Sequence, residues 1–302
     1  MNTIQEVLQS GTKWLEARGV DAPRYSMQSL MVHVLGRDKT WLYLHYEDAL
    51  TEPQLEQLRH LLRERGKGVP LQHLLGETEF FRRSFRSDAR ALVPRPETEE
   101  LVEMALQMVP RREGLRVLDM GCGSGVIGIT LALELAALRP DVVLADISEA
   151  ALSLALENAT ALGARVRTYR SDLFSAWTPA PENAVIPPDD FDLVLANLPY
   201  VPEGENVSAE VRHDPATALY GGADGLDIVR RFVVDLLPHA SPGALVLLEV
   251  GHDQGQAVCD LMRAAGYERT QVLTDMSGKA RFPIGYAPQA APSAADDATH
   301  EG

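Results

Sequence analysis

The chain has 302 residues, of which 45% are hydrophobic and 24% charged, a composition typical of a globular protein with room for one large domain and a smaller one. Its net charge of −15 at pH 7 argues against direct nucleic-acid binding, because a protein that neutralises phosphates needs a basic surface. The two cysteines show no metal-site spacing and no window reaches the ~18 to 20 apolar residues that span a bilayer, so we expect a cytoplasmic protein without metal, disulfide or membrane contact.

Residues 1–75 predict a small helical domain. Apolar side chains recur at spacings of three and four in the segments 3–15 and 26–36. A third helical segment, 51–68, begins with a threonine suited to capping and ends at glycines. Residues 76–92 then switch to a period of two with aromatic residues, which predicts a β-hairpin that links two domains.

From residue 93 to 287 short apolar strands alternate with amphipathic helices, which predicts an α/β fold with a mostly parallel sheet covered on both faces. Only "SGKA" separates the last two strands, so they should form an antiparallel hairpin at one edge. Residues 288–302 are rich in Pro, Ala and Asp and are expected to be a disordered tail. The expected strands are 116–120, 142–147, 166–172, 191–200, 244–250, 268–276 and 281–287.

The segment "LDMGCGSGVIG" lies where the first parallel strand turns into its helix. Glycines at 121, 123 and 125 allow the backbone to approach a ligand, and the following helix offers unpaired N–H groups. A dinucleotide fingerprint should start directly after the strand, but counted from Gly121 its third glycine position is Val126. A glycine-rich turn that serves packing alone is the plainer alternative.

Acidic residues close the next two strands. Asp146 can accept hydrogen bonds from both hydroxyls of a ribose, since Ser148 is available to cap the following helix in its place. Asp172 can accept from an adenine amino group, while Leu173 and Phe174 can offer backbone contacts and an apolar wall. A plain turn at the end of the strand explains this second group equally well.

These features should converge on one crevice. In a doubly wound sheet the strands that end at Gly121 and Asn197 are neighbours at the switch point, and ligands bind outside their carboxyl ends. The order of motifs favours S-adenosylmethionine over a cofactor with phosphates. No Walker lysine follows the glycines, and no arginine stands beside Asp146 to bind a 2′-phosphate.

The residues Asn197, Leu198, Pro199 and Tyr200, which we call the tetrad, suit the methylation of a planar amide nitrogen. The Asn197 side-chain oxygen and the Leu198 carbonyl can accept its two N–H bonds and align it with a sulfonium methyl group. Pro199 fixes the backbone direction, and Tyr200 can lie against the planar group. Catalysis then depends on positioning and electrostatics and needs no strong general base.

Across residues 5–287 the chain resembles the N(5)-glutamine methyltransferases of peptide chain release factors. The resemblance includes the segments "VPLQHLLGETEFF", "LVPRPETEELVEMAL", "HDPATALYGGADGLDIVRR" and "LLEVGHDQGQAV" besides the motifs above. It implies a seven-stranded class I S-adenosylmethionine-dependent methyltransferase, Rossmann-like and doubly wound, behind an N-terminal helical bundle that docks a class 1 release factor. The implied reaction methylates the glutamine of that factor's Gly-Gly-Gln motif, and we expect a monomer.

The resemblance also implies the site residues. For the substrate glutamine these are the tetrad together with Arg95 and Glu97, although an ion-paired helix start explains the latter two equally well. The expected cofactor contacts are Asp119, Gly121, Cys122, Gly123, Ser124, Gly125, Asp146, Ile147, Asp172, Leu173 and Asn197.

Three residues depart from the family pattern. Leu198 replaces the first proline of the usual N-P-P-Y tetrad, Cys122 stands where threonine is common, and Leu173 stands where an aromatic side chain can stack on adenine. The Leu198 carbonyl remains, so we expect activity. We expect weaker cofactor binding from Leu173.

Three alternatives stay open. The same chemistry on a ribosomal protein is less favoured, because that branch tends to carry Pro-Arg-Ser-Pro where this chain has "PRPETE". An adenine-N6 methyltransferase uses a similar tetrad with base flipping, but the acidic charge argues against it. A cofactor-binding scaffold that Leu198 has inactivated is the alternative without catalysis.

Overall fold

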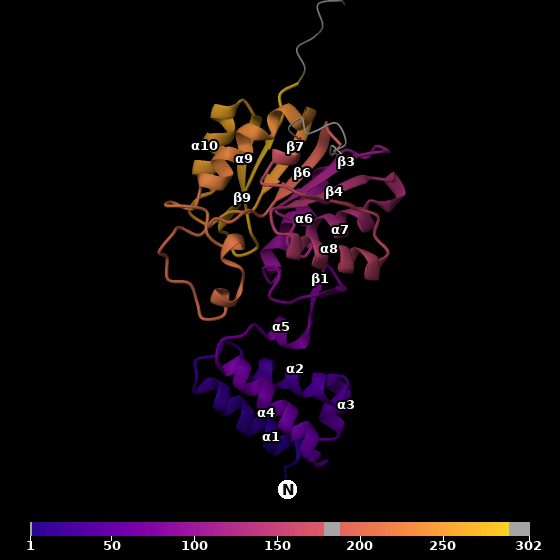
Figure 1. Cartoon of the computed structure of the whole chain (residues 1–302), viewed down its shortest axis with the longest axis vertical. Coiled ribbons are helices and arrows are strands. Elements are labelled where there is room, and N and C mark those ends of the chain that lie inside the picture. Colours follow the sequence, from indigo (N-terminus) through magenta and orange to yellow (C-terminus); the bar gives the residue numbers. More distant parts are fainter. Residues whose placement is uncertain (1, 178–187, 290–302) are drawn as a thin grey trace, which may run out of the picture.

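The computed structural model describes residues 2–177 and 188–289 and shows two bodies joined by a narrower region (Figure 1). A helical body holds the N-terminus, and a larger α/β body follows it. Each has its own buried apolar cluster. Most of the predicted tail, 290–302, lies outside the described residues.

Five helices form the N-terminal body. The three helices predicted from the sequence are present, and α4 begins with a capping box between Thr51 and Gln54. Two short helices were not predicted, because they have too few turns to repeat an apolar pattern. A Cβ at Gly11 would lie 2.4 Å from the Met27 sulfur, so this glycine allows the first two helices to pack closely. The helices are α1 (Ile4–Glu16), α2 (Pro23–Leu35), α3 (Lys39–Leu44), α4 (Glu52–Gly66) and α5 (Leu71–Leu75).

The predicted hairpin between the two bodies is confirmed. Strand β1 (Glu77–Phe80) pairs antiparallel with β2 (Arg83–Arg86). Phe80 and Phe85 are buried edge to face and belong to the core of the α/β body. The hairpin therefore packs as part of the larger body.

The larger body contains the predicted seven-stranded sheet, in the order β5-β4-β3-β6-β7-β9-β8. The first five of these strands are parallel, and β9 runs antiparallel to both of its neighbours. The last two strands form the expected hairpin, with β8 at the edge. The strands are β3 (Arg116–Met120), β4 (Asp141–Asp146), β5 (Arg167–Arg170), β6 (Phe191–Ala196), β7 (Ala240–Leu248), β8 (Glu268–Thr274) and β9 (Ala280–Tyr286).

Helices cover both faces of the sheet (Figure 1). Every residue of β6 is buried, and its alternate side chains enter different clusters: Leu193 and Leu195 on one face, Val194 and Ala196 on the other. The first cluster packs against α6 (Pro96–Met108), α7 (Val126–Glu134) and α8 (Glu149–Leu162), the second against α9 (Asp227–Asp235) and α10 (Gly255–Ala265).

The switch point of the sheet lies where it was expected. Met120 at the end of β3 is paired with Ala196 at the end of β6. The predicted strand 191–200 ends at Ala196, so the tetrad lies beyond the sheet. Ala196 is paired with Met120 and Leu248, the last residues of β3 and β7, so no neighbouring strand continues beyond it, which explains the early end.

A long segment after β6 contacts both bodies. Glu210 on this segment forms a 2.9 Å ion pair with Arg65, which is buried at the end of α4. Nε2 of His213 lies 3.5 Å from the Lys67 carbonyl oxygen. The segment thus connects the N-terminal helices to the carboxyl edge of the sheet (Figure 1).

Candidate active site

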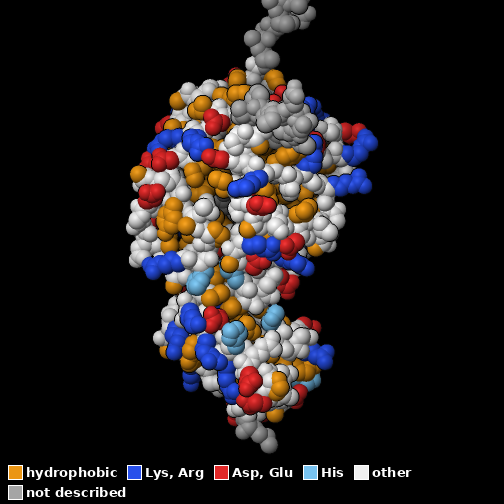
Figure 2. All heavy atoms as spheres, in the orientation of Figure 1, with side chains coloured by type: hydrophobic (Ala, Val, Ile, Leu, Met, Phe, Trp, Pro, Cys, Tyr) orange, Lys and Arg blue, Asp and Glu red, His pale blue; other side chains and the backbone are white. Residues whose placement is uncertain are grey.

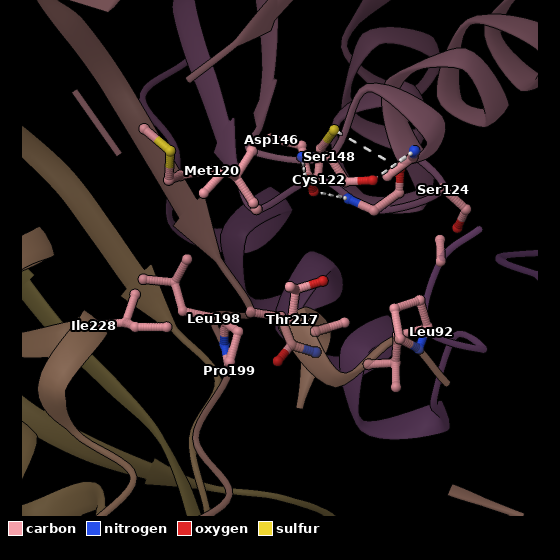
Figure 3. A pocket seen from close by; sticks show the side chains of 18 of the residues that line it. Leu92, Met120, Cys122, Ser124, Asp146, Ser148, Leu198, Pro199, Thr217 and Ile228 are labelled. Atoms are coloured by element: carbon pink, nitrogen blue, oxygen red, sulfur yellow. Dashed lines mark hydrogen bonds between the residues drawn. The ribbon is translucent and has the colours of Figure 1, made fainter. Parts of the chain in front are cut away.

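A cavity of about 360 Å³ opens at the carboxyl ends of β3, β4, β5 and β6. Asp146 and Ser148 lie on one side of it, with Leu198 and Pro199 on the opposite side (Figure 3). Asp119, Gly125, Tyr200 and Glu97, which the sequence also indicated, do not line it. The predicted residues that line it are Arg95, Gly121, Cys122, Gly123, Ser124, Asp146, Ile147, Asp172, Leu173, Asn197, Leu198 and Pro199.

The glycine turn fits a ligand that approaches its backbone. Gly121 and Gly123 have φ values of 71° and 53°, in the left-handed region that favours glycine. A Cβ at Gly121 would lie 3.0 Å from Cδ2 of Leu198, so a side chain there would fill the space between the turn and the tetrad. The glycine at position 121 therefore keeps this space open beside the turn.

Asp146 both shapes the turn and faces the cavity. Its carboxylate accepts the Gly123 N–H at 2.9 Å and the Ser148 N–H at 2.8 Å. Ser148 caps α8 by accepting the Ala151 N–H, as predicted. A carboxylate has about four lone-pair sites, so Asp146 keeps acceptor capacity for the two hydroxyls of a ribose. Burial raises the pKa of Asp146.

Asp119 lies behind the glycine turn. It is fully buried, and its Oδ2 accepts the Gly128 N–H at 2.8 Å. Among the described residues its Oδ1 has no hydrogen-bond partner. Burial raises the pKa of Asp119 to about 7. The residue anchors the first turn of α7 and does not line the cavity.

The residues after β5 divide between the cavity and the core. Asp172 lines the cavity and pairs with Arg231, whose Nη2 lies 3.2 Å from both carboxylate oxygens. Leu173 also lines it. Phe174 does not, because its ring is stacked on Phe232 and His239. Of the two residues that were expected to form an apolar wall here, Leu173 therefore lines the cavity and Phe174 belongs to the core.

The tetrad is held by a glycine-rich segment, residues 220–227, for which the sequence predicted no role of its own. A Cβ at Gly221 would lie 2.4 Å from the Pro199 carbonyl oxygen, and one at Gly225 would lie 2.1 Å from that of Tyr200. Gln254 also donates to the Tyr200 carbonyl, at 3.0 Å. Burial raises the pKa of the Tyr200 hydroxyl to about 12. The feature of the sequence that could have indicated these contacts with the tetrad is the glycine pattern in "YGGADGLD".

Arg95 connects the cavity to the long segment after β6. Its Nη2 donates to Asp214 at 3.1 Å, and Asp214 also accepts the Val93 N–H. Pro215 and Thr217, next along the chain, line the cavity. The ion pair between Arg95 and Asp214 therefore fixes a wall of the cavity. This agrees with the alternative in which Arg95 belongs to an ion-paired helix start.

Two further residues at this site were not predicted. Nδ2 of Asn197 donates to Oγ1 of Thr98 at 3.3 Å, and that hydroxyl donates to Oε2 of Glu249 at 2.8 Å. Both Thr98 and Glu249 are buried. The feature of the sequence that could have indicated the role of Glu249 is a carboxyl group near the end of the apolar run "ALVLLEV".

Two absences concern only the described part of the chain. Within residues 2–177 and 188–289, no group of three His, Cys, Asp or Glu side chains could hold a metal ion. Within the same ranges, no helix is long and apolar enough to cross a membrane.

A sheet of this strand order, with a glycine turn after its first strand and the cavity beside it, is that of a class I S-adenosylmethionine-dependent methyltransferase. Two family models match the chain: the PrmC N-terminal domain over residues 6–76 and the methyltransferase small domain over residues 100–214.

Release factor glutamine methyltransferases are similar along nearly the whole chain. The protein of that name from Koribacter versatilis is 35% identical, covering 95% of this chain and 99% of its own length. That from Deinococcus radiodurans is 36% identical, covering 92% and 96%. The chain therefore belongs to the release factor glutamine methyltransferase family, and its cofactor is S-adenosylmethionine. A solved release factor-specific protein-(glutamine-N5) methyltransferase from Alicyclobacillus acidocaldarius is 26% identical, covering 68% of this chain and 99% of its own, with a TM-score of 0.40.

Proposed function

We propose that this protein transfers the methyl group of S-adenosylmethionine to N5 of the glutamine in the Gly-Gly-Gln motif of class 1 peptide chain release factors. One observation carries the proposal beyond family membership: the glycine turn and the first three residues of the tetrad line the same cavity from opposite sides. A cofactor on the turn and an amide on the tetrad would meet between them.

The glycine-turn side is proposed to hold the cofactor, which supplies an electrophilic methyl group. The backbone of the turn from Gly121 to Ser124 lies against the ligand, and the remaining lone pairs of Asp146 accept the ribose hydroxyls. Leu173 and Ile147 supply apolar contact. Asp172 accepts from the adenine amino group with the oxygen capacity that its pair with Arg231 leaves.

The tetrad is proposed to hold the amide of the substrate. Among the described residues no hydrogen bond is donated to the Leu198 carbonyl or to Oδ1 of Asn197, so both are available as acceptors. Two acceptors fixed on the two N–H bonds orient the nitrogen lone pair toward the methyl group. Pro199 fixes the backbone beyond the Leu198 carbonyl, and Tyr200 lies further along the same turn. Glu97 lies in the first turn of α6 and does not line the cavity.

The two bodies are proposed to divide the work. Residues 1–75 dock the release factor, residues 76–92 form the linker, residues 93–287 carry out the transfer, and residues 288–302 are a tail. The partly buried ion pair between Arg65 and Glu210 supports a fixed distance between docking surface and cavity.

We also propose a monomer that acts in the cytoplasm without direct contact to nucleic acid. The net charge of −15 supports the absence of nucleic-acid contact. In Figure 2 the basic and acidic side chains of the described residues are interspersed on the face shown, without a continuous basic field. A nucleic-acid binder needs such a field, because phosphate contacts supply much of its affinity.

Methylation of a release factor tests the proposal. The protein is incubated with labelled S-adenosylmethionine and a purified class 1 release factor, either wild type or with the Gly-Gly-Gln glutamine replaced by alanine. Label is expected in the wild-type factor alone, and mass spectrometry should place the methyl group on the Gly-Gly-Gln peptide. Equal labelling of both factors would overturn the proposal, and a ribosomal protein that competes for the label would point to the other glutamine substrate.

A further inference from the structure

A path of two hydrogen bonds lies behind the tetrad. It begins at Glu249, directly after β7, passes through Thr98 in the first turn of α6, and ends at the Asn197 amide. The side chains of Glu249 and Thr98 are buried, with residue exposures of 2% and 3%, and neither is used by the reaction proposed above except through Asn197. Three segments far apart in the sequence thus meet at one amide.

The direction of these two hydrogen bonds depends on the charge of Glu249. An ionised carboxylate only accepts, so the single hydroxyl proton of Thr98 must point to Glu249. The Thr98 oxygen then accepts, and Asn197 must present its NH2 group to it, which leaves Oδ1 toward the cavity. A neutral carboxyl can donate instead. Thr98 would then donate to Asn197, and the amide oxygen would turn away from the substrate.

We infer that ionised Glu249 is a positioning residue: acting through Thr98, it holds the Asn197 amide with its oxygen toward the substrate nitrogen. The inference rests on the proposed function for the identity of the substrate, but the orientation of the amide belongs to the protein itself. The amide of a glutamine substrate needs the Asn197 oxygen as an acceptor for one of its N–H bonds. If Asn197 presented its NH2 group instead, two donors would face each other.

The surroundings of Glu249 allow both charge states near neutral pH. Burial is the main effect and raises the pKa of Glu249 to about 7, and the charge of Glu97 on α6 acts in the same direction. The hydrogen bond from Thr98 and the charge of Arg281 on β9 oppose the shift. Arg281 is itself paired with Asp275 at 2.9 Å. Tyr200, which also faces Glu249, stays neutral in this range because its own pKa is raised to about 12.

The test compares Glu249→Gln with the wild type. Glutamine has a similar shape but can either accept from Thr98 or donate to it, so it no longer fixes the direction of the hydrogen bonds. We expect kcat for methylation of the release factor to fall about 10- to 100-fold at pH 8, with cofactor affinity within about twofold. The wild-type kcat should rise with pH through about 7, as the carboxyl ionises, and the variant should lack this rise. Glu103→Gln, on an exposed position of α6, is the matched control.

A second pair of variants separates positioning from folding. Thr98→Ser keeps the hydroxyl and should retain activity within about threefold, whereas Thr98→Val has nearly the same volume without it and should lose about tenfold or more. Equal activity of the two variants, or an unchanged kcat and pH profile in Glu249→Gln, would overturn the inference.

A measurement without turnover distinguishes failure of the inference from failure of the proposed function. The side-chain amide protons of Asn197, followed by NMR in the full chain, should shift between pH 6 and pH 8 in the wild type and not in Glu249→Gln. If no release factor is methylated but this difference is seen, the proposed function fails and the positioning role stands. Asn197 resonances that respond to pH equally in both proteins would contradict that role.

Discussion

The two sides of the cavity are built differently. On the glycine-turn side the contacts that fix the geometry are local, since Asp146 binds N–H groups 2 and 23 residues away. On the tetrad side they join distant segments: Asn197 to Thr98 across 99 residues and Thr98 to Glu249 across 151. The glycine turn and its ribose acceptor can thus be specified by one supersecondary unit, whereas the amide site requires the completed fold.

The sharpest test of this difference is Asn197→Ala. Loss of the side-chain acceptor removes an interaction that the proposed transition state needs, and we expect kcat to fall about 100- to 1000-fold. Because the glycine turn and Asp146 are untouched, the dissociation constant for S-adenosylmethionine should change by less than about tenfold. Rapid-quench kinetics at saturating cofactor and calorimetry measure the two quantities. A large loss of cofactor affinity with unchanged kcat would show that the two sides are not separable.

The opposite variant, Asp146→Asn, should affect the other side. An amide nitrogen cannot accept, so the variant loses one bond to a backbone N–H and one to the ribose, and cofactor affinity should fall about 10- to 100-fold. At saturating cofactor kcat should stay within about threefold of the wild type. Asp141→Asn, at the other end of β4 and outside the cavity lining, is the control and should leave both quantities unchanged.

The same contrast explains how far the sequence could predict the molecule. The strand order around β3 and β6, the edge hairpin and the cap at Ser148 were predictable, because short-range patterns and the switch-point rule determine them. The roles of Thr98 and Glu249 were not, since nothing near either residue in the sequence indicates a partner so far away along the chain. Phe174 was misplaced for a related reason: whether an aromatic residue after a strand faces a cavity or the core depends on what packs above it, here Phe232.

Stability should depend on pH through the buried carboxyl groups. The pKa of Glu249 in the folded protein is about 7, above the ordinary value of 4.5, so the folded state holds a proton that the unfolded state has lost. The free energy of unfolding should therefore fall as pH rises from 5.5 to 8, by about 1 to 2 kcal/mol from this group. Asp119, whose pKa is also about 7, acts with the same sign.

Urea unfolding of the cofactor-free protein at the two pH values checks this dependence. Glu249→Gln has no carboxyl to ionise and should lose less stability over the same range, although its kcat is reduced. The same pH dependence in the variant and the wild type would show that ionisation of Glu249 does not cause it, and would contradict the raised pKa of this group.

The smallest effect is expected at Leu198, the residue that departs from the family tetrad. Its carbonyl is the part that the proposed reaction uses, and proline keeps a carbonyl at the same position, so Leu198→Pro should change kcat by no more than about threefold. The side chain has a different role: it is buried, and its Cδ2 lies where a Cβ on Gly121 would come within 3.0 Å, so it fills space between the two sides of the cavity. Loss of the leucine side chain in Leu198→Pro should lower the free energy of unfolding by about 1 to 2 kcal/mol. The smaller conformational freedom of proline in the unfolded chain partly offsets this loss. Thermal unfolding and single-turnover methylation separate these effects. A sharp rise in turnover would mean that the leucine side chain restrains the amide, and that the two sides of the cavity are coupled through Leu198.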